Sequence, residues 1–217
     1  MVSRKHTAWK KSRKFGDVYG GRVRPRLVDN IFNRQHSLHA PGPQDDLPIR
    51  MTDNPSRDFF FPVTADEAVE CLRRLPRKHH EGITHLWLRR VRKKDYDEDH
   101  PFANYICGSS VQLIVLYPWP TDMLLRFPGP RKPTPKMLRT YKQWCTDLVK
   151  RDGQWCLKWT REALRSFYLE DLLLHEVGHH IDYYRRWWTD ANSKQQEDFA
   201  ENYAVIWSRR LKSVYEE

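Results

Sequence analysis

The sequence predicts an α+β fold, in which a compact domain with a small sheet over residues 51–217 follows a basic arm over residues 1–50. Two stretches rich in branched and aromatic residues, 83–91 and 111–117, are typical of strands. Four segments predict helices: 64–75, which begins with a capping box, and 134–151, 160–184 and 195–204, in which apolar residues recur at three- and four-residue steps. The change in charge and apolar pattern near residue 50 indicates where the arm ends and the domain begins.

The arm is strongly basic. Residues 1–50 contain 11 Lys or Arg against four Asp, a balance of +7 out of the +10 of the whole chain. Its apolar periodicity is poor, and Gly-Gly and Pro-Gly-Pro interrupt it, so we expect a largely disordered segment. Clustered Lys and Arg release counterions from phosphate, which makes nucleic acid or another acidic partner a candidate ligand of the arm. The alternative is a solvated tail that aids solubility.

Length and composition restrict the class of protein. A chain of 217 residues can bury a sizeable core. No apolar run is long enough to cross a bilayer, and residues 1–30 lack a hydrophobic signal core, so we expect no membrane association. Four cysteines show no CxxC spacing, and we expect them to be reduced, partly buried thiols in a cytoplasmic protein: Cys71, Cys107, Cys145 and Cys156. A disulfide remains an alternative, and the oligomeric state stays open.

In the first half of the domain, the sequence predicts one helix, one strand and one β-hairpin. Thr64 to Glu67 forms a capping box, so a helix should begin there and run to about Leu75, before Pro76. Ile83 to Val91 alternates and predicts a strand. A second strand, Val111 to Tyr117, should pair with Ala103 to Cys107 across a Gly-Ser-Ser turn.

The middle of the chain predicts a connector, a helix and a short strand. Pro118 to Pro135 contains six prolines, so we expect a loop or an extended connector there. Thr134 and Pro135 are an N-cap and a first-turn proline, and the apolar stripe that follows predicts a helix to about Arg151. Gln154 to Trp159 alternates and predicts a strand. Thr160 then caps the next helix.

That next helix carries the motif on which the functional interpretation depends. His175-Glu176-Val-Gly-His179 is an HExxH pattern, and residues four apart lie on one face of a helix. The two imidazoles can therefore offer nitrogens to one zinc ion, with water in an open position and Glu176 placed to take its proton. A chance match on a surface helix is the alternative. The apolar stripe along this helix opposes it, because buried histidines need a partner.

A second helix downstream can complete the metal site. Gln195 to Ala204 predicts a helix with Glu197 and Glu201 four apart on one face. Either carboxylate could be the third ligand. Asp182, on the first helix, is a further candidate, although it is better placed to bond a ligand imidazole. His180 should lie at the helix surface.

The combination of HExxH with a following E-x-F-A-E-x-aromatic helix resembles the zincin metallopeptidases of the gluzincin branch, as in the catalytic domain of anthrax lethal factor. The shared features also include Asp182, three residues after the second histidine, and an aromatic soon after it. The resemblance covers about the last 45 residues. It implies that His175, His179 and Glu197 bind Zn²⁺, that Glu176 is the general base, and that Asp182 and Glu201 orient ligands.

The resemblance also implies a zincin-like metallopeptidase domain over residues 51–217 that cleaves a protein or peptide substrate. In that family an outer sheet edge above the metal helix pairs with the substrate backbone, which would be Val111–Tyr117 or Ile83–Val91 here. A donor to the oxyanion is expected as well, and three tyrosines are candidates: Tyr183, Tyr184 and Tyr203.

Two other functional classes remain open at this point. A non-peptidase zinc hydrolase of the deformylase kind would need a Gly-Cys-Leu segment, but Trp155 precedes Cys156-Leu157. A catalytically inactive zincin scaffold could bind nucleic acid through the arm, although a purely structural zinc site has no use for Glu176. Substrate identity and cleavage preference do not follow from the sequence.

Overall fold

A computed structural model gives the fold of the chain and describes residues 38, 40–96, 100–108, 111–127, 129–145 and 147–213. The prediction of a disordered arm falls mostly outside these residues. Within them, strand β1 begins at Ile49, and Leu38 is buried against the sheet. The ordered domain therefore starts some residues before the boundary expected at residue 51.

The centre of the fold is a four-stranded sheet in the order β1-β3-β5-β4. β1 (Ile49–Thr52) and β5 (Val111–Leu116) pair in parallel with β3 (His85–Leu88), and β4 (Ala103–Gly108) pairs antiparallel with β5. β2 (Phe59–Phe60) and β6 (Trp119–Pro120) form a small ribbon. The β4–β5 hairpin and the β3 strand are confirmed.

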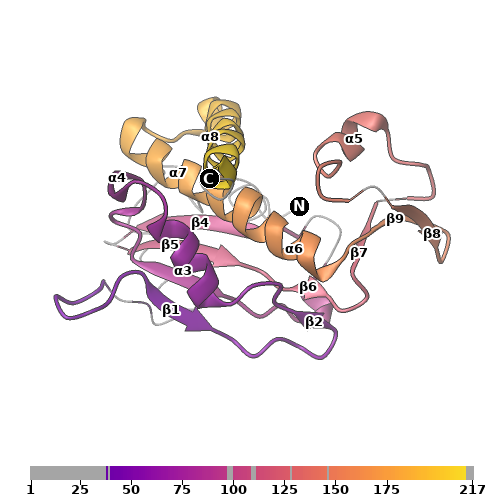
Figure 1. Cartoon of the computed structure of the whole chain (residues 1–217), viewed down its shortest axis with the longest axis horizontal. Coiled ribbons are helices and arrows are strands. Elements are labelled where there is room, and N and C mark those ends of the chain that lie inside the picture. The colour runs from indigo at the N-terminus through magenta and orange to yellow at the C-terminus, as the bar shows by residue number, and fades with distance from the viewer. Residues whose placement is uncertain are drawn as a thin grey trace, which may run out of the picture.

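One face of the sheet is covered by helices, as Figure 1 shows. The helices are α3 (Ala65–Arg73), α4 (Arg77–His80), α6 (Arg161–Phe167), α7 (Leu173–Arg185) and α8 (Ser193–Ser213). Apolar residues of α3, α6, α7 and the sheet share one core. A second apolar cluster, which includes Leu38 and Trp87, covers the opposite face. The molecule is therefore a mixed α/β structure with α7 on the sheet and α8 beside α7.

The predicted helix starts are correct. Thr64 Oγ1 accepts from the Glu67 N–H at 3.2 Å and the Glu67 carboxylate accepts from the Thr64 N–H at 2.8 Å, which is the expected capping box. Thr160 caps α6 through the Ala163 N–H. Between α6 and α7 the chain passes through a π-helical segment, Tyr168–Leu172, and continues in the same direction.

The expected helix from Thr134 to Arg151 is wrong for most of its length. α5 covers only Pro135–Arg139, and residues 148–151 form strand β8 instead. The reason is a two-residue turn: Asp152 and Gly153 have φ of 50° and 81°, the positive values that a tight hairpin requires. β8 (Leu148–Arg151) therefore pairs antiparallel with β9 (Gln154–Lys158). The strand β9 agrees with the prediction for Gln154 to Trp159.

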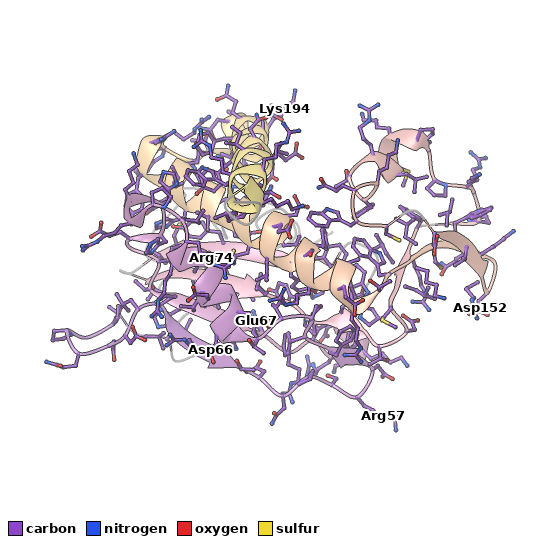
Figure 2. The ribbon with its side chains drawn as sticks, viewed as in Figure 1. Arg57, Asp66, Glu67, Arg74, Asp152 and Lys194 are labelled. Carbon is purple, nitrogen blue, oxygen red and sulfur yellow. The ribbon has the colours of Figure 1, made fainter. Side chains whose placement is uncertain are left out.

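The proline-rich stretch is also more ordered than expected. It contains β6 and β7 (Leu124–Arg126), and β7 pairs with β9 to complete a three-stranded sheet in the order β7-β9-β8. This sheet and α5 form a separate lobe beside α6 in Figure 1. Asp152 marks the tip of its hairpin in Figure 2. The lobe forms a wall of the cavity described next.

Candidate metal centre

The candidate site lies where α7 and α8 are in close contact. A β-carbon built on Gly178 would lie 2.7 Å from the Cα of Ala200, so the two helices can approach this closely only because residue 178 lacks a side chain. His175 and His179 lie on α7 on either side of this contact, and Glu197 lies on α8, three residues before Ala200. The helix crossing thus brings the three side chains together.

The distances between these side chains fit a metal-binding triad. The two histidine Nε2 atoms are 3.0 Å apart, and the Glu197 carboxylate oxygens lie 3.4 Å from Nε2 of His175 and 3.6 Å from Nε2 of His179. Tetrahedral bonds of about 2.0–2.1 Å place two ligand atoms about 3.3–3.4 Å apart. The three residues are the group that could hold a metal ion among the described residues.

The electrostatic environment gives the two histidines different pKa values. Burial, together with the neighbouring His175, lowers the pKa of His179 well below its ordinary value. Burial also lowers the pKa of His175, but the Glu197 hydrogen bond and the charges of Glu176, Glu197 and Asp171 outweigh it, so that pKa is raised. His179 is therefore neutral, the form in which a histidine binds a metal ion. Its Nδ1 and the Glu197 Oε1 are buried without a hydrogen-bond partner in the described part of the chain.

Glu176 is held in a dry environment beside the triad. Its side chain is 5% exposed, and burial raises its pKa to about 7; the charge of His175 and a hydrogen bond from the Tyr105 backbone N–H act in the opposite direction, while Glu197 adds to the increase. Its Oε2 has no hydrogen-bond partner among the residues that the structure describes. A carboxylate with a pKa near neutrality can both accept and release a proton at physiological pH.

A cavity of about 1010 Å³ opens onto Glu176 and the triad. Residues 101–104, which lead into and begin β4, line it on the sheet side, and residues 139–143 line it on the α5 lobe. Asp171, Glu201 and Arg209 contribute to its wall from the helices. A peptide segment is of a suitable size for such a cavity.

Glu201 lies outside the triad. It is exposed on α8, one turn after Glu197, and lines the same cavity. Asp182 differs from its expected role, because its carboxylate faces Trp188 and Arg186 rather than a ligand imidazole. The Trp188 Nε1–H donates to its Oδ2 at 3.0 Å, and Arg186 Nε lies 2.6 Å from its Oδ1.

The expected position of His180 is wrong. It was expected at the helix surface, but it is 1% exposed and lies between the Tyr105 hydroxyl, 3.1 Å from its Nδ1, and the Glu81 carbonyl oxygen, 3.0 Å from its Nε2. α4 contacts α7, and Glu81, the residue that follows α4, brings its carbonyl oxygen onto the imidazole. The apolar pattern of one helix does not reveal that a segment distant in the sequence covers its other side.

The expected substrate-facing strands are also wrong. Ile83–Val91 and Val111–Tyr117 contain β3 and β5, which are interior strands of the sheet, and β4 is the outer strand that borders the cavity. The three tyrosine candidates do not line this cavity. The Tyr203 hydroxyl instead lies 2.9 Å from Nδ1 of His79.

Asp171 and Tyr141 are among the cavity residues that sequence reasoning did not assign to the site. Asp171 precedes His175 by four residues, a spacing that could have placed both on one face of the helix. Burial raises the pKa of the Asp171 carboxyl, with His175 opposing and Glu201 adding to the increase. Tyr141 follows α5 and reaches the cavity through tertiary contacts, for which the sequence has no local signal.

Comparison of the chain with protein-family models, with curated proteins and with solved structures finds no match. Of the helices in the described residues, none combines the length and the apolar character that crossing a membrane requires. The four cysteines are all buried and unbridged, in agreement with the expectation of reduced thiols.

Proposed function

We propose that the chain is a zinc-dependent metallopeptidase of the zincin type, in its gluzincin branch, that hydrolyses a peptide bond in a protein or peptide. One observation supports this most strongly. The HExxH histidines on α7 place their Nε2 atoms 3.0 Å apart. Glu197 on α8 places one carboxylate oxygen 3.4 Å from His175 Nε2 and the other 3.6 Å from His179 Nε2, next to a buried glutamate and a cavity of peptide size.

His175, His179 and Glu197 would hold the ion. Two imidazoles and one carboxylate are the donor set of many catalytic zinc sites, and three protein ligands leave a position open for water or substrate. A bound zinc ion would supply a Lewis acid that polarises the scissile carbonyl and makes water acidic. The buried, unsatisfied Glu197 Oε1 and the neutral His179 fit such a cation.

Glu176 would act as the general base and then as the general acid. Its carboxylate would take a proton from the attacking water and deliver it to the leaving amine. The Tyr105 backbone N–H and the apolar surroundings hold it in place and keep its pKa close to neutrality. Such a role needs an oxygen that is available to a proton, and Glu176, which lines the cavity, has its Oε2 without a hydrogen-bond partner among the described residues.

Tyr141 is our candidate for the donor to the oxyanion. Its side chain lines the same cavity as the triad, and burial raises the pKa of its hydroxyl, so the hydroxyl keeps its proton at neutral pH. The tyrosines expected from the sequence lie elsewhere. Tyr141→Phe should lower kcat with little change in metal content.

The decisive test of the reaction compares Glu176→Gln with a control variant, Glu162→Gln, which removes an exposed carboxylate at the start of α6. Hydrolysis of a mixed peptide library by the zinc-loaded protein, followed by mass spectrometry, measures activity. We expect Glu176→Gln to lose about 10²–10⁴-fold in rate with its metal retained, and Glu162→Gln to keep its rate. Undiminished hydrolysis by Glu176→Gln would rule out the proposed role of the glutamate.

A further inference from the structure

We propose that the cavity selects peptides that carry a carboxylate group, and that Arg139, Lys142 and Arg209 bind this group. The inference rests on the proposed peptidase function for its reaction, but the binding preference can be measured separately. It follows from how charged side chains are distributed around the cavity.

The three cations come from two separate elements. Arg139 is the last residue of α5, and Lys142 lies in the turn that follows it, whereas Arg209 lies near the end of α8. All three are exposed, and all three line the cavity that contains His175, Glu176 and Glu197. A ligand in the cavity can therefore meet positive charge from both the α5 lobe and the helical layer.

None of these three side chains takes part in an ion pair in the part of the chain that the structure describes. Many other arginines in these residues do, as in the Arg165–Glu67 pair at 2.7 Å and the Arg126–Asp122 pair at 2.5 Å. The guanidinium and ammonium donors of the three cations are therefore available to an incoming acceptor. Arginine in particular binds carboxylates through two parallel hydrogen bonds.

The acidic residues of the cavity are grouped on the helices that carry the triad. They are Asp171, Glu176, Glu197 and Glu201, all on α7, α8 or the segment before α7. Three cations against four carboxylates give −1, and a divalent cation at the triad changes this sum to +1.

This arrangement favours a substrate with an anionic group placed away from the bond that is cut. The scissile carbonyl would lie at the triad, while a carboxylate would lie toward Arg139, Lys142 and Arg209. The carboxylate could belong to an aspartate or glutamate side chain or to the C-terminus of the peptide. Both sources present the same chemistry to the cations, so an experiment must separate them.

The test uses octapeptide pools in which Glu, or Gln as its neutral isostere, occupies each position in turn, with the C-terminus either free or amidated. Wild-type protein loaded with zinc gives kcat/KM for each pool. Competition binding to zinc-loaded Glu176→Gln gives affinities without turnover. Both measurements are repeated in Arg139→Gln/Lys142→Gln/Arg209→Gln and in a control, Arg57→Gln/Arg131→Gln/Lys136→Gln, which removes the same charge from exposed positions that do not line the cavity.

We expect wild type to favour at least one carboxylate-bearing pool over its neutral counterpart by about tenfold or more, mainly through KM. The preference should approach unity in the cavity triple variant and persist in the control. A preference in amidated Glu pools identifies a side-chain carboxylate, and one confined to free C-termini identifies the terminal group. The inference would be overturned by equal kcat/KM and affinity for the Glu and Gln pools, by no binding of any pool, or by a preference that the triple variant retains. If binding selectivity appears without hydrolysis, the peptidase proposal fails and the selectivity stands.

Discussion

His179 shows how the surroundings of one residue define the site. Its imidazole is 2% exposed, its pKa is depressed by burial and by His175, and its Nε2 faces both His175 and Glu197. A neutral imidazole that points toward a carboxylate and a second imidazole is already in the form that a metal ion needs. The motif predicted the identity of this residue and the apolar stripe of its helix predicted its burial, but only the fold shows its orientation.

His180 supplies a prediction about pH. Its pKa in the folded protein is lowered to about 4, because burial and nearby His80 outweigh the hydrogen bond to the Glu81 carbonyl, whereas the unfolded value is near 6.5. Below pH 6.5 the unfolded chain binds more protons at this position, so the free energy of unfolding should fall as pH falls toward 4. Between pH 7.5 and 5 the loss attributable to His180 should be about 2 kcal/mol.

Denaturant unfolding of the metal-free protein in a chelator measures this effect. The His180→Gln variant should be less stable than wild type at pH 7.5, yet should lose about 2 kcal/mol less than wild type on acidification to pH 5. Using the metal-free protein removes any contribution from metal release. If both proteins lose the same free energy over this range, His180 is not held neutral by its environment.

At the scale of elements, the contact between α7 and α8 sets the geometry of the triad. Sequence reasoning predicted both helices, but it could not predict how closely they approach. Gly178, between the two histidines, normally weakens a helix by about 1 kcal/mol relative to alanine, and in this position it allows the approach to Ala200.

Gly178→Ala should therefore destabilise the protein, although alanine favours helices. The added methyl group would lie 2.7 Å from the Ala200 Cα and 3.2 Å from its Cβ, so α8 must move and carry Glu197 with it. We expect a loss of about 1–3 kcal/mol in stability and a weaker metal affinity. Gly42→Ala, where the nearest atom lies at an ordinary 3.6 Å, is the control and should change stability by less than about 0.5 kcal/mol. An increase in stability in Gly178→Ala would show that the contact between α7 and α8 can accommodate a methyl group at residue 178.

The β8–β9 hairpin explains the largest error in the sequence reading of elements. The helical stripe of Leu138, Tyr141, Cys145 and Leu148 is present in the sequence, but the chain leaves the helix after Arg139. Asp152-Gly153 between two alternating segments is a strong hairpin signal, and the expectation of a helix to about Arg151 leaves it out of account. Pairing of residues 148–151 with β9, whose other edge pairs with β7, then favours strand over helix there.

At the scale of the whole molecule, the described part of the chain from Leu38 onward contains all the candidate site residues. Removal of residues 1–37 should leave peptide hydrolysis unchanged. Removal of residues 1–50 should destabilise the protein by about 2 kcal/mol or more, because it deletes the buried Leu38 and half of β1. Thermal unfolding and hydrolysis rates of the two truncated proteins measure this. Loss of hydrolysis in the shorter deletion would assign part of the catalytic unit to residues 1–37.

The sequence alone shows that positive charge is concentrated in the N-terminal part of the chain. Residues 1–50 carry +7 of the net charge of +10, and the binding of nucleic acid or another acidic partner there remains a prediction. What the sequence could not reveal is the second charged feature, the three cations of the cavity. Arg139 and Arg209 are 70 residues apart in the chain, and the three cations line one cavity only through the packing of the α5 lobe beside the helices.

The measurement that tests the account most directly is the metal content of the purified protein, by elemental analysis, in wild type, Glu197→Ala and Glu201→Ala. We predict one zinc ion per chain in wild type and in Glu201→Ala, and a loss or large reduction in Glu197→Ala, because among the residues that the structure describes it is Glu197 that lies with both histidines. A folded wild-type protein that takes up no zinc, or a Glu197→Ala variant that keeps it as tightly as wild type, would contradict the proposed centre.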